Sequence, residues 1–135
     1  MSVLHNTKLW LIIIAIGHIG LGAGGSYATY GNDELAIIGF FTVVGVYLLY
    51  AAFMLEGQAQ ARLAAVFAGP IVVWFLVCAA MGLEPTYATE NVEWKLSPEL
   101  IPPLFFWGMT ALTGLLGWNM EESAPDTDMN IINLL

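Results

Sequence analysis

Residues 9–32 read LWLIIIAIGHIGLGAGGSYATYGN, a run of 24 residues without Asp, Glu, Lys or Arg. A helix rises about 1.5 Å per residue, so about 20 residues cross the ~30 Å hydrocarbon core of a bilayer. The run is apolar on every face, whereas a strand of a membrane barrel alternates apolar with polar residues. We therefore predict that residues 9–31 form a transmembrane helix.

Three further uncharged runs follow, each 21 residues long, at 35–55, 63–83 and 100–120. The sequence therefore predicts an all-α integral membrane protein in which residues 1–120 form an antiparallel bundle of four transmembrane helices. The first two connections between the runs are short and favour antiparallel neighbours, whereas the third is longer. Four crossings place both termini on the same side. The predicted helices are 9–31, 34–56, 62–83 and 98–119. Residues 121–135 are predicted to form an acidic tail with an apolar end.

The overall composition excludes other classes of protein. Hydrophobic residues make up 59% of the chain and charged residues 10%, against about 25% charged residues in a soluble domain. A water-soluble monomer is thereby excluded. The formal net charge is -8, with only 3 basic residues, so no basic patch exists to neutralise the phosphates of a nucleic acid. The expected surroundings are the lipid bilayer and other membrane subunits.

The few basic residues predict the orientation in the membrane. Lys8 and Arg62 fall on one side of the predicted bundle, and Lys95 falls on the other. Cytoplasmic loops carry the excess of Lys and Arg, so we expect both termini in the cytoplasm. The expected aromatic belts contain Trp10 and Trp118 at that interface, and Tyr27 and Tyr30 at the opposite one.

Small residues predict where helices approach closely, because helix association in lipid depends on close packing. Gly20 and Gly24 form a GxxxG pair within the first run. The partner helix in these contacts belongs either to this chain or to another one. The candidate packing residues are Gly17, Gly20, Gly24, Gly31, Ala65, Gly69, Gly114 and Gly117. Pro70 is expected to kink the third helix, as prolines commonly do in membrane helices, and a hinge is the alternative.

His18 is the candidate binding residue, because an ionisable side chain inside a membrane helix is often functional. One interpretation is a neutral histidine bonded to a hydroxyl on another helix, such as Thr42, Thr110 or Thr113. A second is an axial ligand to haem or chlorophyll, with Gly22 and Gly25 leaving room for the flat ring. A third is a step in a proton or solute path. The sequence contains no grouping of residues at metal-ligand spacing.

No catalytic set of nucleophile, base and acid is visible, and none of the four uncharged runs contains a carboxylate. The leading hypothesis is a small non-catalytic accessory subunit of a larger membrane complex, in contact with other subunits or copies of itself. A homo-oligomeric channel or carrier for a small solute is an alternative. A redox or light-harvesting subunit with a haem or chlorophyll on His18 is another.

Overall fold

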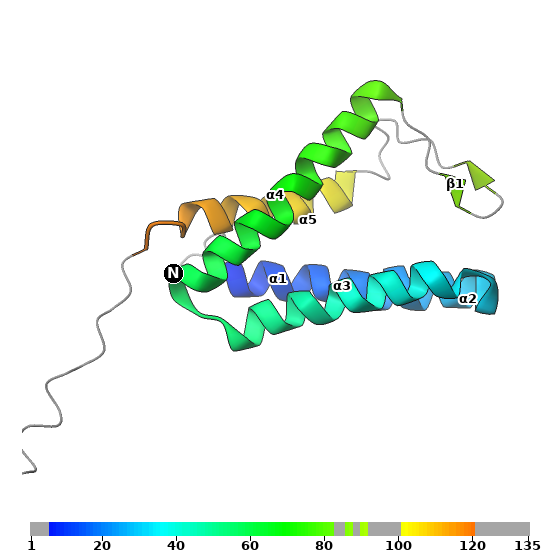
Figure 1. The fold of residues 1–135 in the computed structure, drawn as a ribbon, viewed down its shortest axis with the longest axis horizontal. Helices are drawn as coiled ribbons and strands as arrows, with labels where there is room; N and C mark the ends of the chain where they lie inside the picture. The colour runs from blue at the N-terminus through cyan, green and yellow to red at the C-terminus, as the bar shows by residue number, and fades with distance from the viewer. Residues whose placement is uncertain (1–5, 83–85, 88–89, 92–100, 121–135) are drawn as a thin grey trace, which may run out of the picture.

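A computed structural model describes residues 6–82, 86–87, 90–91 and 101–120 (Figure 1). Within these ranges the chain is helical apart from turns and one antiparallel pair of two-residue strands. The strands are β1 (Thr86–Tyr87) and β2 (Glu90–Asn91). The helical class predicted from the sequence is confirmed.

The first half of the chain is nearly continuous helix that reverses once. It consists of α1 (Thr7–Ile16), the π-helix η2 (Gly17–Gly25), α2 (Ser26–Tyr30), the 3-10 helix η3 (Gly31–Glu34) and α3 (Leu35–Met54). The Asn6 side chain caps α1 by accepting a hydrogen bond of 3.1 Å from the Leu9 N–H, as a helix N-cap does. The reversal lies at Gly31, whose φ of 60° is disfavoured for residues with a side chain.

The second half contains α4 (Gly57–Met81) and α5 (Ile101–Leu116). Only Leu55 and Glu56, both extended, separate α3 from α4. Residues 57–61, which lie between the helices predicted at 34–56 and 62–83, are therefore helical, and Arg62 lies inside α4. Gly82, with φ 61°, ends α4 in the left-handed conformation common at helix C-termini.

Two stretches, Thr7–Met54 and Gly57–Met81, are long and apolar enough to cross a membrane. The first contains the reversal at Gly31. The apolar helix α5 has 16 residues, so the part of it that the structure describes is about 24 Å long at ~1.5 Å per residue.

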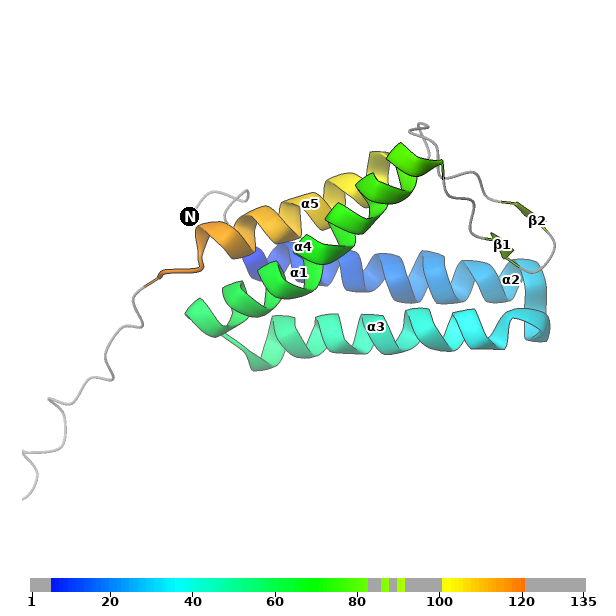
Figure 2. The ribbon, with the colours of Figure 1, turned by 45° about the horizontal axis from the view of Figure 1, so that its top comes forward.

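The helices associate as two pairs. The segment α1–η2–α2 lies alongside α3, and α5 packs against α4 (Figure 1). Figure 2 shows α4 crossing the first pair obliquely and moving away from α3 toward its own C-terminal end. The start of α1 and the end of α5 lie at the same end of the molecule. The buried core lies where the two pairs meet and consists of Leu11, Ile14, Ala15, Leu48, Ala51, Ala52, Ala64, Ala68, Trp107 and Ala111.

Candidate functional site

His18 lies at the start of the π-helix, with its imidazole anchored to its own helix. Its Nδ1 is 3.0 Å from the carbonyl oxygen of Ile14, which also accepts the backbone N–H of Gly17. A carbonyl oxygen only accepts hydrogen bonds, so Nδ1 carries the proton in this contact. In the neutral ring, the lone pair is therefore on Nε2.

Two aromatic rings from other helices hold the imidazole edge-on. The ring centroid of Phe41, on α3, lies 5.7 Å away at an interplanar angle of 70°. The Trp107 ring, on α5, lies 5.2 Å away at 90°, and this residue is only 3% exposed. Perpendicular arrangements of this kind are favoured between π systems. Three elements thus fix the orientation of one imidazole.

The Nε2 atom of His18 has no hydrogen-bond partner among the described residues. In this part of the chain, Trp10 Nε1 is the one buried side-chain nitrogen or oxygen without a partner. The imidazole is part-buried, so its unpaired Nε2 keeps accessible surface.

The hydroxyl groups expected to bond His18 are all occupied within their own helices. Thr42 donates to Ile38 O at 2.8 Å, Thr110 to Phe106 O at 3.0 Å and Thr113 to Thr110 O at 3.2 Å. The sequence-based expectation of a bond from His18 to one of them is wrong for this structure. Threonine satisfies its hydroxyl locally by bonding to a carbonyl three or four residues back.

The room expected for a flat ring beside His18 is partly filled. A methyl group at Gly22 would lie 2.8 Å from Phe41 Cγ, whereas at Gly25 it would meet nothing within 4 Å. The π-helix forms i→i+5 bonds and has a wider turn than an α-helix. Residues seven apart therefore do not lie on the same face of this helix, so Gly25 lies on a different face from His18.

The small residues at the contact of α4 and α5 pack closely. A methyl group at Gly114 would lie 2.5 Å from Ala65 N and 2.6 Å from Ala61 O. At Gly117 it would lie 2.7 Å from the Ala61 Cβ. One close contact that the sequence reasoning missed involves Gly45 on α3, where a methyl group would lie 2.5 Å from the Ile19 side chain.

The other candidate packing glycines have open space where a side chain would be. A methyl group at Gly17, Gly20 or Gly31 in the first half of the chain, or at Gly69 on α4, would meet nothing within 4 Å. At Gly24 it would meet only Ile19 O, at 3.4 Å. The expected stripe assumed α-helical periodicity, which η2 does not have. Within the described part of this chain, no atom of a second helix lies within 4 Å of the Cβ position at these glycines.

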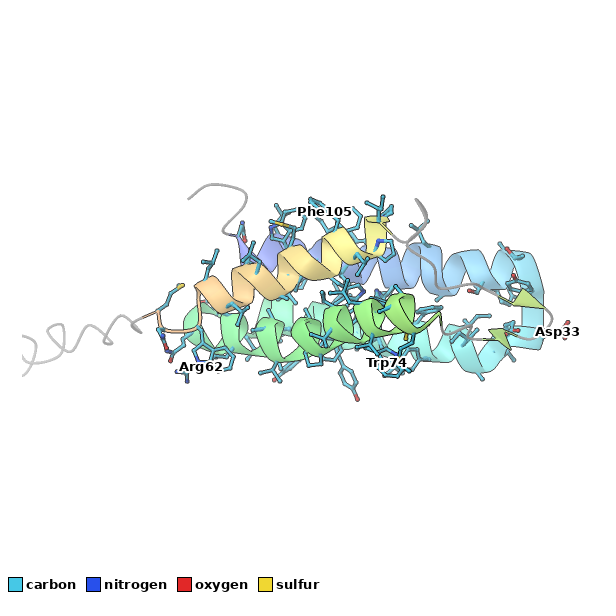
Figure 3. The ribbon with its side chains drawn as sticks, turned by 90° about the horizontal axis from the view of Figure 1, so that it is seen from above. Asp33, Arg62, Trp74 and Phe105 are labelled. Carbon is cyan, nitrogen blue, oxygen red and sulfur yellow. The ribbon has the colours of Figure 1, made fainter. Side chains whose placement is uncertain are left out.

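The two basic residues of the described chain lie at one end of the molecule. Lys8 Nζ is 5.2 Å from the centroid of the Phe53 ring, and Arg62 Cζ is 5.7 Å from that of the Trp118 ring. Arg62 Nε also donates to the Trp118 carbonyl at 3.2 Å. Figure 3 shows Arg62 and Asp33 at opposite ends of the long axis.

Two of the expected belt residues differ in their surroundings. Trp118 is 36% exposed beneath Arg62, whereas Trp10 is 7% exposed. Trp10 packs against Phe105 and Phe106 of α5, with ring centroids at 5.8 Å and 6.4 Å. The position of Trp10 is thus determined by contact with α5 rather than by exposure at an interface.

Gln60 is an important residue that the sequence reasoning placed in a loop. It is 8% exposed, and its Nε2 lies 2.9 Å, 3.0 Å and 2.8 Å from the carbonyl oxygens of Ala51, Ala52 and Leu55. The last carbonyls of a helix have no partner within the helix, and Gln60 supplies one. The sequence signal that could have identified this cap is an amide side chain shortly after the end of an apolar run.

Pro70 lies on the surface of α4, which is continuous through it. An apolar groove of about 180 Å³ lies between α1, α3 and α4, with Leu11, Tyr47 and Phe67 in its lining. A groove of about 280 Å³ at the end of the bundle includes Asn6 and Gln60. Neither groove contains His18 or Pro70, so neither connects the residues expected to line a path.

Comparison of the chain with protein-family models, with curated proteins and with solved structures finds no match.

Proposed function

We propose that the chain crosses a membrane four times, with both termini in the cytoplasm, and that it is a non-catalytic subunit of a larger membrane complex. In this arrangement α1–η2–α2, α3, α4 and α5 each provide one crossing. Large apolar side chains on the outer faces support contact with lipid, including Leu21, which is 82% exposed, and Trp74 and Phe105 (Figure 3). Exposed apolar surface of this extent is typical of a membrane or protein contact.

The distribution of charge supports the proposed orientation. Lys8 and Arg62 lie at the end that carries Phe53 and Trp118, and Asp33 lies at the opposite end. Positive residues concentrate on the cytoplasmic side of membrane proteins, and aromatic residues at the interfaces. The end that contains the start of α1 is accordingly the cytoplasmic one.

The observation that carries the subunit proposal is the open backbone around Gly20. Gly17 and Gly20 have free space where a side chain would be, and the neighbouring Ile16 and Leu21 are exposed. In lipid, glycine lets the backbones of two helices approach closely. A helix of another subunit is the partner that such a surface fits.

Native mass measurement of the tagged full chain, extracted in a mild detergent, tests the proposal. We expect a discrete assembly heavier than the 14.7 kDa chain, and we expect Gly20→Leu to release the monomer. Gly108→Leu is the matched control, because Gly108 also has free space but lies outside the proposed contact. A wild-type chain found only as a monomer contradicts the proposal, and whole multiples of one chain mass favour a homo-oligomer.

A further inference from the structure

The apolar groove of about 180 Å³ between α1, α3 and α4 has a buried floor and exposed sides. Its floor is formed by side chains that are at most 3% exposed, namely Leu11, Leu48 and Ala51. The exposed side chains of its lining are Tyr47, Tyr50 and Leu63. The groove is therefore open to whatever surrounds the chain, which is lipid in the proposed membrane placement.

The groove lies in the cytoplasmic half of the proposed span. Tyr50 lies four residues before Met54, where α3 ends, and Phe67 lies ten residues after Gly57, where α4 begins. At about 1.5 Å per residue, these two side chains lie about 6 Å and about 15 Å from the same end of the molecule. This inference rests on the proposed function, which makes that end cytoplasmic. The groove then runs from the level of the headgroups into the hydrocarbon.

The size of the groove favours a slender occupant. One turn of an α-helix is about 5.4 Å long and about 10 Å wide with its side chains, and it fills a cylinder of about 420 Å³. The groove has less than half of that volume. An acyl chain is only one methylene group wide, so it fits a groove that is too narrow for a helix.

A cation lies one helical turn from the groove, on its cytoplasmic side. Lys8 precedes the floor residue Leu11 by three positions on α1, and Phe53 follows Tyr50 by three positions on α3. Residues three apart lie on the same face of a helix, and Lys8 Nζ is 5.2 Å from the centroid of the Phe53 ring. Among the described residues Lys8 forms no ion pair, either with Glu56 at this end or with another carboxylate. Its ammonium group is thus available to an anion at the level of the headgroups.

We propose that the groove binds an acyl chain of an anionic phospholipid from the cytoplasmic leaflet, and that Lys8 pairs with the phosphate of the same lipid. The apolar floor contacts the chain, and Tyr50 lies at the depth where aromatic side chains meet the headgroups. A zwitterionic lipid carries a cation of its own beside the phosphate, whereas an anionic lipid does not. Lys8 therefore selects the anionic lipid, as basic residues near the cytoplasmic surface do.

Native mass measurement of the full chain, released from nanodiscs with equal amounts of phosphatidylglycerol and phosphatidylcholine, tests the proposal. We expect one retained phosphatidylglycerol per chain. Lys8→Gln changes an exposed residue and lowers the ratio of retained phosphatidylglycerol to phosphatidylcholine about fivefold. Arg62→Gln is the matched control, because Arg62 contacts Trp118 and does not line the groove. It removes the same charge and leaves the ratio unchanged.

A second pair of variants tests the groove itself. Ala51→Leu fills the floor and abolishes retention of the lipid, whereas Ala80→Leu adds the same atoms to an exposed position of α4 outside the groove and retains it. Far-ultraviolet dichroism confirms that both variants keep their helices. Phosphatidylglycerol with a photoreactive group in its acyl chain is expected to label Leu63 or Phe67, which needs no variant.

Equal retention of the two lipids by the wild type overturns the proposal, and so does labelling spread evenly over the exposed apolar residues. A photoreactive residue in place of Leu63 that crosslinks to another protein chain also overturns it, because a subunit then covers the groove. A discrete assembly without retained lipid contradicts this inference alone. A monomer that retains the lipid contradicts the subunit proposal alone.

Discussion

Replacing Gly114 by alanine tests the contact between α4 and α5 most directly. The added methyl group would lie 2.5 Å from Ala65 N and 2.6 Å from Ala61 O, where ordinary contacts are 3.4–4 Å. Both neighbours are backbone atoms of α4, which cannot rotate away as a side chain does. The two helices must therefore separate by about 1 Å, and over-packing of this kind costs about 1–3 kcal/mol.

A matched substitution on the same helix isolates this cost. Gly108→Ala places a methyl group with nothing within 4 Å. Both variants gain the helix propensity of alanine, which is about 1 kcal/mol more favourable than that of glycine. The difference in the free energy of unfolding between the two variants is therefore the steric cost alone. We expect Gly114→Ala to be about 1–3 kcal/mol less stable than Gly108→Ala.

Reversible unfolding of the full chain in mixed micelles, followed by tryptophan fluorescence as the fraction of sodium dodecyl sulfate rises, measures this difference. We expect Gly108→Ala to unfold at a higher fraction than the wild type, and Gly114→Ala at a lower fraction than Gly108→Ala. Equal midpoints for the two variants would refute the close contact between α4 and α5.

Three further predictions use the same unfolding assay or a topology assay. Gln60→Met leaves the carbonyls of Ala51 and Ala52 in α3, and that of Leu55 just after it, without the Gln60 amide as donor. We expect a loss of about 1–3 kcal/mol; no measurable loss would show that these carbonyls find other partners. Gly22→Ala collides with Phe41, and we expect Phe41→Leu to recover part of its loss in a double-mutant cycle, whereas strictly additive losses would contradict the contact. Arg62→Gln removes a cation from the end proposed to be cytoplasmic, together with the contact of that cation with an aromatic ring. We expect less than about 1 kcal/mol of destabilisation, but a larger fraction of inverted chains when cysteines are labelled from either side of the membrane. An unchanged fraction of inverted chains would show that Arg62 does not set the orientation.

The helical class and the long apolar stretches were predictable because they depend on local features. A charge-free run of 24 residues such as 9–32 fits few structures other than a helix in an apolar environment, whatever its neighbours are. The predicted packing role of Gly114 and Gly117 stays a prediction. The structure places Gly114 in α5 and Gly117 just after its end, both close to Ala61. The predicted crossing of the membrane by four helices and the predicted acidic tail at 121–135 stay predictions, and the tail lies outside the described residues.

The differences between prediction and structure lie where regular structure was assumed. The stripe through Gly17, Gly20 and Gly24 was predicted for an α-helix, and η2 changes the direction in which each later residue faces. The packing of these glycines against another helix stays a prediction. The region from Gly57 to Arg62 reads as a polar loop, but α4 begins at once because Gly57 takes up the positive φ of the turn.

By itself the sequence determined that the chain is helical and apolar along most of its length, and that its described cations lie at one end. Composition and spacing along the chain suffice for these features. Only the tertiary structure decided that Phe41 fills the space at Gly22, that Gln60 caps α3 and that Nε2 of His18 has no partner among the residues that the structure describes. Each of these features depends on the angle and distance at which two helices distant in sequence pack together. Side-chain packing between the helices sets this geometry, and the sequence of one helix alone does not determine it.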